Sequence, residues 1–346
     1  MSSAGLPDVP GLPEGSRTRT PDERDLPEVV ALLSDLRSPG DKPVDVESVT
    51  ANLVGVGSWT RRQRVVRDAD GRLTGWAVVH DRAAGRTNVG LVVARHPAED
   101  QVARALLGWL AATGADLARF RGQPDTQLDA SPTAADVRTQ GWLAADGYRK
   151  VREWLQMVLP VTDADAPAPP TRPGVVVRRV REHPSGLPVA DDVQTVHRLL
   201  EESFADHFNS YRESFGEFVQ RLREDPWHRW DHWWVAELEE AEGEEVRRRP
   251  AGVLISSVAP PDAEGRYGSY VDYIGVHRRA RGRGVAKALL ATVVADAAER
   301  GRDRVTLEVD ADSPTGADGL YRSLGYQVDH VTQSWHRQVD AAPPPG

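Results

Sequence analysis

Cysteine is absent from this chain of 346 residues. Its absence excludes disulfide bonds, thiolate metal sites and any mechanism that passes through a cysteine nucleophile. The sequence also lacks an apolar run of about 18 residues, so we predict no membrane-spanning helix. The first residues have neither the basic stretch nor the apolar stretch of a secretory signal. From these absences we expect a cytoplasmic protein that makes no contact with membranes.

Basic residues are fewer than acidic residues. The chain has 43 Lys and Arg residues against 52 Asp and Glu residues, which gives a formal net charge of −9. This balance argues against a nucleic-acid-binding protein and favours a cationic partner such as an amine. Hydrophobic residues make up 40% of the chain, enough for cores of ordinary size, and the length is sufficient for two domains.

The most informative segment of the sequence is VDYIGVHRRARGRGVAKALL, residues 271–290. Asp272–Val276 is typical of a strand, and a helical pattern begins at Val285. Between them, Gly282 and Gly284 allow a tight turn just before the helix N-terminus, whose unpaired N–H groups favour anions. The pattern predicts a phosphate or diphosphate site. It matches neither a Walker loop nor a Rossmann loop, and the alternative is an arginine-rich surface turn.

A second motif follows in VDADSPTGADGLYRSLGY, residues 309–326. Arg304–Val309 alternates as a strand. Ser313 and Pro314 then predict the start of a short helix, with Ser313 as the N-cap and proline in the first turn. The predicted helix carries Tyr321 and ends before Gly325 and Tyr326.

These two motifs resemble the signatures of the GNAT superfamily, the GCN5-related N-acetyltransferases. The loop Arg281–Ala286 is similar to the pattern R-x-x-G-x-[GA], which binds the diphosphate of acyl-CoA, and the pattern also fits one register earlier, from Arg279. The second motif is similar to V-x-x-x-N-x-x-A-x-x-L-Y-x-x-x-G-[FY], with Ser313 near the usual asparagine and one extra residue before Ala317. The resemblance covers roughly residues 175–337.

The resemblance implies an α/β fold with a mostly antiparallel sheet, in which a central parallel pair of strands splays apart to hold acetyl-CoA. It assigns Tyr321 as the general acid that protonates the CoA sulfur, and a phenol with a pKa near 10 remains protonated at pH 7. It assigns Asp272 as the general base, with Glu308 as the second choice. The residues that it implies for acyl-CoA binding are Ile274, Gly275, Val276, Arg281, Gly282, Arg283, Gly284, Val285, Ala286 and Ser313.

Both catalytic assignments have alternatives. In the alternative for Tyr321, the side chain packs in the helix and its hydroxyl group is hydrogen-bonded elsewhere. In the alternatives for Asp272, the carboxylate binds the substrate ammonium or makes a structural hydrogen bond. An aspartate with an ordinary pKa near 3.9 is a poor base for an ammonium, so burial or a water relay is required. Strand alternation places Asp272 on the opposite face from Val271 and Tyr273.

The acceptor wall is expected after the first helix of this unit, at Phe204, His207 and Tyr211, and again at Asp225–Trp234. The sequence DPWHRWDHWW has two interpretations, an aromatic cleft with carboxylates for an amine or simply core and interdomain packing. His228 and His232 stand four apart, which suits one face of a helix, but no third ligand is evident. We therefore predict no metal site.

The same order of elements occurs twice in the chain. The helix sequence Val102–Leu107 repeats Val285–Leu290 with one change, Arg for Lys. At the anion site, however, Glu99 and Asp100 stand where the later copy has Gly282 and Arg283, so the first copy is predicted to have lost acyl-CoA binding and catalysis. The predicted units are a disordered segment 1–15, a degenerate GNAT domain 16–161, a Pro/Ala linker 162–173, a catalytic GNAT domain 174–340 and a disordered tail 341–346.

The sequence therefore predicts an enzyme, an acetyl-CoA-dependent N-acetyltransferase that acts on a primary amine of a small molecule, as a monomer or a homodimer. The tandem layout is similar to that of the mycothiol synthase family, whose members acetylate a cysteinyl-glucosaminyl-inositol, and this is the second hypothesis. A third hypothesis, from a different class, is an acyl-CoA-binding regulator or scaffold without catalysis.

Overall fold

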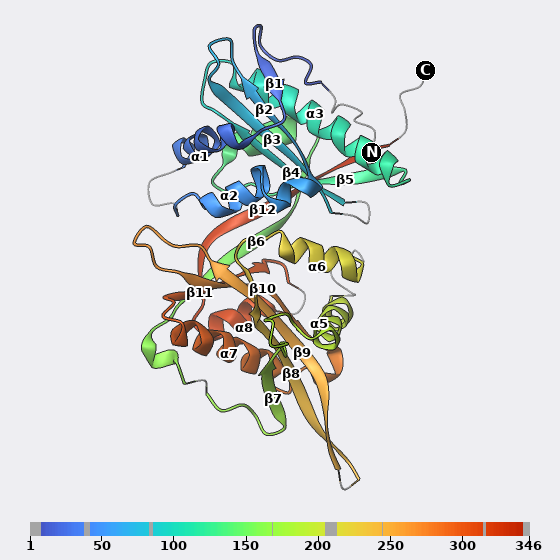
Figure 1. The fold of residues 1–346 in the computed structure, drawn as a ribbon, viewed down its shortest axis with the longest axis vertical. Coiled ribbons are helices and arrows are strands. Elements are labelled where there is room, and N and C mark those ends of the chain that lie inside the picture. The colour runs from blue at the N-terminus through green and yellow to red at the C-terminus, as the bar shows by residue number, and fades with distance from the viewer. Residues whose placement is uncertain are drawn as a thin grey trace.

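A single sheet of twelve strands runs through the protein in the computed structural model (Figure 1). The structure describes residues 8–37, 42–82, 86–167, 169–204, 213–243, 245–313 and 316–341. The strand order is β1-β2-β3-β4-β5-β12-β6-β11-β10-β9-β8-β7. We call the parts before and after the linker 162–173 the N-terminal and C-terminal halves.

The two halves contain corresponding elements. The strands of the N-terminal half are β1 (Arg17–Arg19), β2 (Arg61–Arg67), β3 (Leu73–Asp81), β4 (Arg86–Val93), β5 (Asp125–Ala130) and β6 (Arg149–Pro160). Its α-helices are α1 (Leu26–Asp35), α2 (Val46–Leu53), α3 (Glu99–Phe120) and α4 (Val137–Ala145), with 3₁₀ turns η1 (Glu23–Asp25) and η2 (Val56–Thr60).

The C-terminal half has the strands β7 (Val175–Arg179), β8 (His228–Glu242), β9 (Glu245–Ala259), β10 (Gly268–Val276), β11 (Arg304–Asp310) and β12 (Gln327–Asp340). Its α-helices are α5 (Ala190–Ser203), α6 (Phe215–Arg223), α7 (Val285–Glu299) and α8 (Ala317–Ser323), and η4 (Arg278–Ala280) precedes α7. The turn η3 (Asp163–Asp165) lies in the linker. Strands β2 and β3 form an antiparallel hairpin, as do β8 and β9.

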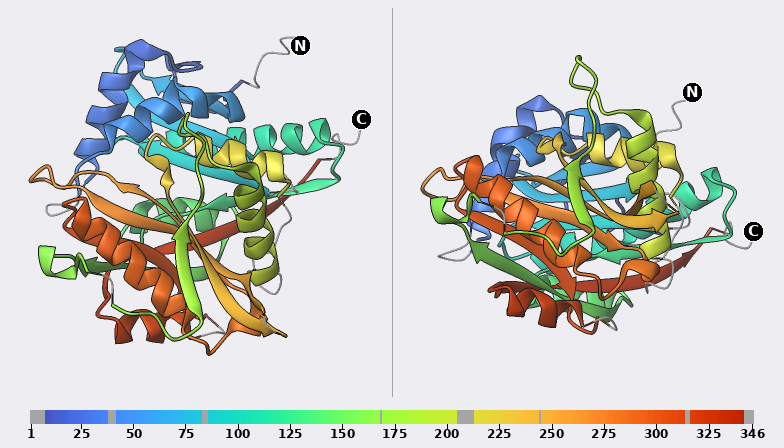
Figure 2. Two further views of the ribbon diagram at one scale, coloured as in Figure 1. Left: turned by 60° about the horizontal axis from the view of Figure 1, so that its bottom comes forward. Right: turned by 90° about the horizontal axis from the view of Figure 1, so that it is seen from below.

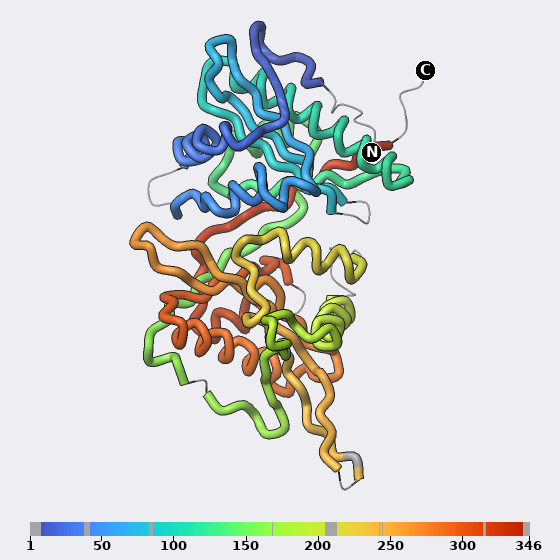
Figure 3. The backbone as a smooth tube through the Cα atoms, in the orientation of Figure 1, coloured from blue at the N-terminus to red at the C-terminus, as the bar shows by residue number. Residues whose placement is uncertain are grey.

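The halves join through strands that cross between them. Strand β6 pairs with β11 of the C-terminal half. The last strand, β12, pairs with β6 along its first part and with β5 along its last part. The red end of the tube in Figure 3 therefore leaves the lower half and ends in the upper one. A continuous ladder of backbone hydrogen bonds connects the two halves, which a pair of independent sheets would lack.

Helices cover both faces of the sheet because strand side chains alternate between the faces (Figure 2). In the N-terminal half, Val65 packs with α1 and α2, while the next residue, Val66, packs with α3. In the C-terminal half, Trp233 packs with α5 and α6, while Trp234 packs with α7. Two hydrophobic cores thus form in each half, one on each face of the sheet.

Three helical segments start in different ways. The first segment, η1, is capped by Asp22, which forms a capping box with Asp25. Helix α5 begins at Ala190, and the carboxylate of Asp192 within it accepts hydrogen bonds from Arg178 and Arg181. Helix α8 begins after the left-handed Gly316, so the prediction that Ser313 is its N-cap is wrong.

No helix within the described parts of the chain is long and apolar enough to cross a membrane.

Candidate functional site

The central parallel strands of the C-terminal half separate part of the way along their length. Strand β10 pairs with β11 only over Ser269–Val271, opposite Val305–Leu307. Beyond this point β10 continues to pair with β9 as far as Val276, and β11 continues with β6 as far as Asp310. The facing backbone edges of the two strands are therefore left without ladder partners in the described chain. An extended ligand can bind such an edge as an added strand.

The separation begins at a β-bulge. The register of β10 against β9 shifts between Val271 and Tyr273, so Asp272 is the inserted residue. Val271 packs in the core beside α7, and Tyr273 packs in the core beside α5 and α6. The expectation that Asp272 faces away from both neighbours is therefore wrong, because the bulge interrupts the alternation. Asp272 shares the α5/α6 face, where it accepts a hydrogen bond from Ser257 Oγ at 3.3 Å.

Burial dominates the chemistry of Asp272. Its second oxygen, Oδ2, is buried and has no hydrogen-bond partner in the described chain. Burial, followed by the negative charge of Asp225, raises the pKa of Asp272 to about 8, against weaker opposition from Ser257 and Arg221. A carboxyl group with this pKa accepts a proton near neutral pH far better than an ordinary aspartate does, as a general base requires.

Glu308, the second candidate base, lies on β11. Its carboxylate accepts a hydrogen bond from Gln156 of β6, and Thr332 Oγ1 lies 3.5 Å away. Its side chain is exposed, yet the surrounding protein atoms raise its pKa through loss of hydration. Leu307 and Val309, on either side, belong to the core beside α7. Glu308 therefore lies on the same sheet face as Asp272, but it is already bonded to the strands that join the halves.

The glycine turn after β10 has the geometry of an anion site. Gly282 and Gly284 have φ values of +75° and +87°, in the left-handed region that favours glycine. Gly284 is the N-cap of α7, and the first helical bond is donated by Ala288 N–H to Gly284 O at 3.0 Å. The N–H groups of residues 285–287 thus have no backbone acceptor in the described chain. Exposed arginine side chains surround the turn, at Arg278, Arg279, Arg281 and Arg283.

An arginine from the linker also lies on this turn. Arg172 Nη1 donates a hydrogen bond to Gly282 O at 3.1 Å. A Cβ atom at Gly284 would lie only 2.8 Å from Arg172 Cδ. The absence of a side chain at Gly284 therefore gives Arg172 its place over the turn. The sequence gives no sign of this contact, since nothing in a proline-rich linker indicates that it meets a turn more than a hundred residues later.

Tyr321 lies on α8, where it is 6% exposed and belongs to the core beside α7. Its ring meets the ring of Tyr326 edge to face, with 5.8 Å between centroids. Burial raises the pKa of Tyr321 to about 12, so the phenol keeps its proton at neutral pH. The hydroxyl group of the neighbouring Tyr326 is buried and has no hydrogen-bond partner in the described chain.

The remaining predicted residues are less well placed or cannot be described. Ser313 lies in the turn after β11, where its N–H donates to Asp310 O at 3.1 Å. Phe204 packs at the edge of the core beside α5 and α6. His207 and Tyr211 lie outside the described residues. Ile274, Gly275 and Val276 lie in the part of β10 that pairs with β9 and not with β11.

The tryptophan-rich segment serves mainly for packing. Trp233 and Trp234 are 0% and 2% exposed, on opposite faces of β8. His228 and His232 lie on this strand and not on a helix, so the helical spacing does not apply. Burial lowers the pKa of both histidines to about 4. In the part of the chain that the structure describes, no group of three or more His, Asp or Glu residues could hold a metal ion.

The corresponding turn of the N-terminal half is filled by its own side chains. Strand β4 pairs with β5 over three residues only, so this pair also separates. Here Arg138 of α4 donates to Glu99 at 2.7 Å and to Val93 O, at the end of β4, at 2.7 Å. Trp142 donates to Asp100 at 2.7 Å, and Arg138 stacks over its ring at 4.8 Å. Carboxylates and a bound guanidinium thus occupy the place where the other half has open N–H groups.

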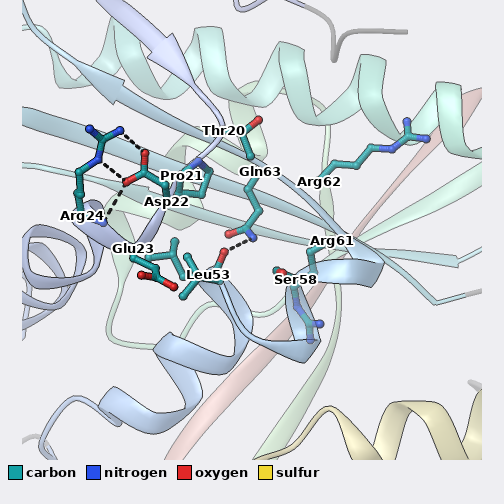
Figure 4. A pocket seen from close by; sticks show the side chains of 11 residues that line it. Thr20, Pro21, Asp22, Glu23, Arg24, Leu53, Ser58, Arg61, Arg62 and Gln63 are labelled. Atoms are coloured by element: carbon teal, nitrogen blue, oxygen red, sulfur yellow. Dashed lines mark hydrogen bonds and ion pairs between the residues drawn. The ribbon is translucent and has the colours of Figure 1, made fainter. Parts of the chain in front are cut away.

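A separate pocket lies in the N-terminal half, between η1, the end of α2 and the start of β2 (Figure 4). It is lined in part by Thr20, Leu53, Ser58, Arg61 and Gln63. None of the residues predicted for catalysis or acyl-CoA binding lines this pocket, so it is distinct from the site on β10 and β11.

Comparisons with known proteins identify relatives of this chain. A sequence model described as the acetyltransferase (GNAT) family matches residues 197–326. The chain is 32% identical over 328 residues to the mycothiol acetyltransferase of Salinispora arenicola, covering 91% of this chain and 94% of the relative. It is 30% identical over 324 residues to the mycothiol acetyltransferase of Salinispora tropica, with the same coverage.

Solved structures share the fold. A GCN5-related N-acetyltransferase from Sphaerobacter thermophilus has a TM-score of 0.66 and 24% identity, covering 96% of this chain and 98% of that one. A tandem GNAT protein from the clavulanic acid biosynthesis pathway has a TM-score of 0.63 and 14% identity, covering 95% of this chain and 100% of that one. At these identities the likeness concerns the fold alone.

Proposed function

Since the chain belongs to the acetyltransferase (GNAT) family, whose cosubstrate is acetyl-CoA, we propose that its C-terminal half transfers an acetyl group to a primary amine of a small molecule. One observation carries the proposal. Strands β10 and β11 separate at Asp272 and leave an open edge that leads to the glycine turn and the N-terminus of α7. An extended chain with a diphosphate at one end matches both features.

In this proposal acetyl-CoA lies between the two strands. Its pantetheine arm bonds to the backbone of Ile274 and Val276, which present the unpaired edge of β10. Its diphosphate lies at the turn formed by Gly282 and Gly284, where three N–H groups of α7 have no backbone acceptor. Arg172 adds a positive charge from the linker at the same place.

The amine approaches from the α5/α6 face, where Asp272 lies. Asp272 takes a proton from the ammonium group, directly or through a water molecule, and the free amine attacks the thioester carbon. The C–N bond forms, the C–S bond breaks, and the CoA thiolate takes the phenolic proton of Tyr321. The new amide nitrogen then loses its second proton, which returns to the Tyr321 phenolate through water. The raised pKa of about 8 suits Asp272 to the role of base, and the pKa of about 12 keeps the Tyr321 phenol protonated until the thiolate forms.

The N-terminal half is not expected to bind acyl-CoA. At its corresponding turn Glu99 is paired with Arg138, and Asp100 accepts a hydrogen bond from Trp142. A diphosphate would have to displace these contacts and lie beside two carboxylates, which repel it. We therefore assign catalysis to the C-terminal half alone.

For the acceptor we propose the amine of a cysteinyl-glucosaminyl-inositol. Two relatives that match this chain over 91% of its length are mycothiol acetyltransferases, at 32% and 30% identity. The similarity extends over both halves of the chain.

A thiol-release screen tests the proposal. Purified protein with acetyl-CoA is incubated with amino sugars, cysteinyl glycosides, polyamines and aminoglycosides, and the free CoA thiol is measured with a colorimetric reagent. We expect release with the cysteinyl glycosides. Release with another class only would contradict the proposed acceptor. CoA binding without any release would instead indicate a regulator or scaffold.

A further inference from the structure

A buried carboxylate connects the two halves beside the proposed site. Glu224 follows α6 in the C-terminal half and is 5% exposed. Its Oε2 accepts a hydrogen bond from Arg61 Nη1 at 2.7 Å, and its Oε1 accepts one from Thr60 Oγ1 at 2.8 Å. Both partners belong to the N-terminal half, where Figure 4 shows Arg61 and Arg62 leaving the start of β2 in different directions.

Arg61 is the cation that balances this charge. His80 Nε2 also lies 3.5 Å from Glu224 Oε2. Burial and the nearby arginines lower the pKa of His80 to about 3, so its ring is neutral at physiological pH. The side chain of Arg61 is 12% exposed, so the ion pair is buried on both sides. A buried pair of this kind is strongly coupled, because either partner alone would be an uncompensated charge.

A second contact to the N-terminal half lies three residues after Glu224, at Trp227. Trp227 Nε1 donates a hydrogen bond to Asp45 Oδ2 at 2.9 Å. Asp45 is the N-cap of α2, where its other oxygen accepts from Ser48 N–H at 3.2 Å. Residues 224–227 therefore have a contact to the N-terminal half at each end. We call these residues the bridging segment.

Asp225 lies between the two contacts. Its Oδ1 accepts a hydrogen bond from Trp227 N–H at 2.8 Å, which fixes the carboxylate within the segment. Trp227 O accepts a hydrogen bond from Val258 N–H at 3.1 Å, and the adjacent Ser257 donates to Asp272, so the segment that holds Asp225 lies beside the proposed base. The negative charge of Asp225 contributes to the raised pKa of Asp272. Helix α6, just before the segment, places Arg221 over the ring of Tyr273 at 5.3 Å, next to Asp272 in β10. The bridging segment and α6 thus cover the amine side of the proposed site.

We propose that the N-terminal half positions the amine-binding side of the active site: Thr60 and Arg61 hold Glu224, Asp45 holds Trp227, and Asp225 between them binds the substrate ammonium beside Asp272. This inference rests on the proposed function of the C-terminal half. A half that has lost its own acyl-CoA turn thereby keeps a role in catalysis. Its contacts do not reach the glycine turn, so acetyl-CoA binding should be independent of them.

Steady-state kinetics test this division of roles. Thiol release is measured for the wild type, Arg61→Ala and Glu224→Ala. Cysteinyl-glucosaminyl-inositol is varied at saturating acetyl-CoA in one series, and acetyl-CoA is varied at saturating amine in the other. We expect each variant to raise the KM of the amine about tenfold, because a displaced wall misplaces the bound ammonium. The KM of acetyl-CoA should stay within about twofold. The double variant should be less than additive, since both changes remove one interaction.

Milder substitutions keep the test decisive if these variants fold poorly. Arg61→Lys retains the positive charge, and its KM for the amine should be close to that of the wild type. Trp227→Phe removes one N–H donor and keeps the ring, and we expect a rise of about threefold in the amine KM alone. Circular dichroism and thermal melting confirm that each variant is folded.

Two control variants separate positioning from general destabilisation. Lys42→Ala removes an exposed ion pair to Asp329 of β12, with 2.9 Å between the charged atoms, and should change neither KM. Arg178→Ala removes one of the two arginine partners of the buried Asp192, near the start of α5, and should lower the melting temperature without separating the two KM values.

The outcomes are distinct. Equal rises in both KM values, or no rise in that of the amine, overturn the inference while leaving the proposed function intact. If the wild type releases thiol with a different amine and not with cysteinyl-glucosaminyl-inositol, the variants are assayed with the amine that is active. Absence of release with every amine contradicts the proposed function and this inference with it.

Discussion

Replacing Asp272 by asparagine should stop acetyl transfer and, at the same time, stabilise the fold at alkaline pH. The carboxyl group is buried, one oxygen has no hydrogen-bond partner in the described chain, and the group has a pKa of about 8 in place of the ordinary 3.8. Asparagine has nearly the same shape and keeps a hydrogen-bonding oxygen for Ser257. It cannot accept the proton of an ammonium, so kcat should fall about a hundredfold or more.

The sign of the stability effect follows from the direction of the pKa shift. The folded state holds the proton more tightly than the unfolded state does, so wild-type stability falls as pH rises above about 4 and levels off above about 8. With 3.8 for the unfolded chain and about 8 for the folded one, the loss between pH 5 and pH 9 is about 4 kcal/mol. Asp272→Asn removes this loss, since asparagine does not titrate.

Urea unfolding at pH 5, 7 and 9 measures the effect. The other titratable groups are common to both proteins, so the difference between the two stability curves isolates Asp272. We expect Asp272→Asn to gain about 4 kcal/mol over the wild type across this range, and wild-type kcat/KM to rise through an apparent pKa near 8. Parallel stability curves would show that the carboxylate costs nothing to bury. Retained activity in the variant would exclude Asp272 as the base.

Three further predictions concern acyl-CoA. Tyr321→Phe should lower kcat at least about tenfold and leave CoA affinity by calorimetry unchanged, because only the phenolic proton is lost; equal losses would make Tyr321 a binding residue. Gly284→Ala should weaken CoA binding about tenfold. Alanine disfavours the φ of +87°, and its Cβ would lie 2.8 Å from Arg172 Cδ, so the turn must change. Unchanged affinity would place the diphosphate elsewhere. Calorimetry should also give one CoA-binding site per chain. Two binding sites would contradict the inference that the Glu99–Arg138 pair closes the turn before α3 in the N-terminal half.

The features that the sequence predicted are local. Gly282 and Gly284 have left-handed backbones and α7 begins at Val285, as the turn and the apolar spacing indicated. The repeated order of hairpin, strand and long helix is present in both halves. Such features depend on backbone freedom and side-chain periodicity within about twenty residues, which a single sequence displays directly.

The features that the sequence did not predict depend on distant partners. The bulge that turns Asp272 toward Ser257 is a property of the register between β9 and β10. The position of Arg172 over Gly282 depends on how the linker returns to α7. Ser313 was expected to cap a helix, yet the chain turns once more and Gly316 takes that place.

The sequence by itself determined most of the elements, the glycine turn before α7 and the residue types of the proposed site. Only the tertiary structure decided that β12 would pass between β5 and β6 and make one sheet of the two halves. It alone decided that Glu224 would meet Arg61. The physical reason is that strand pairing and buried ion pairs join residues far apart in the chain, and their partners are chosen by the packing of the whole molecule.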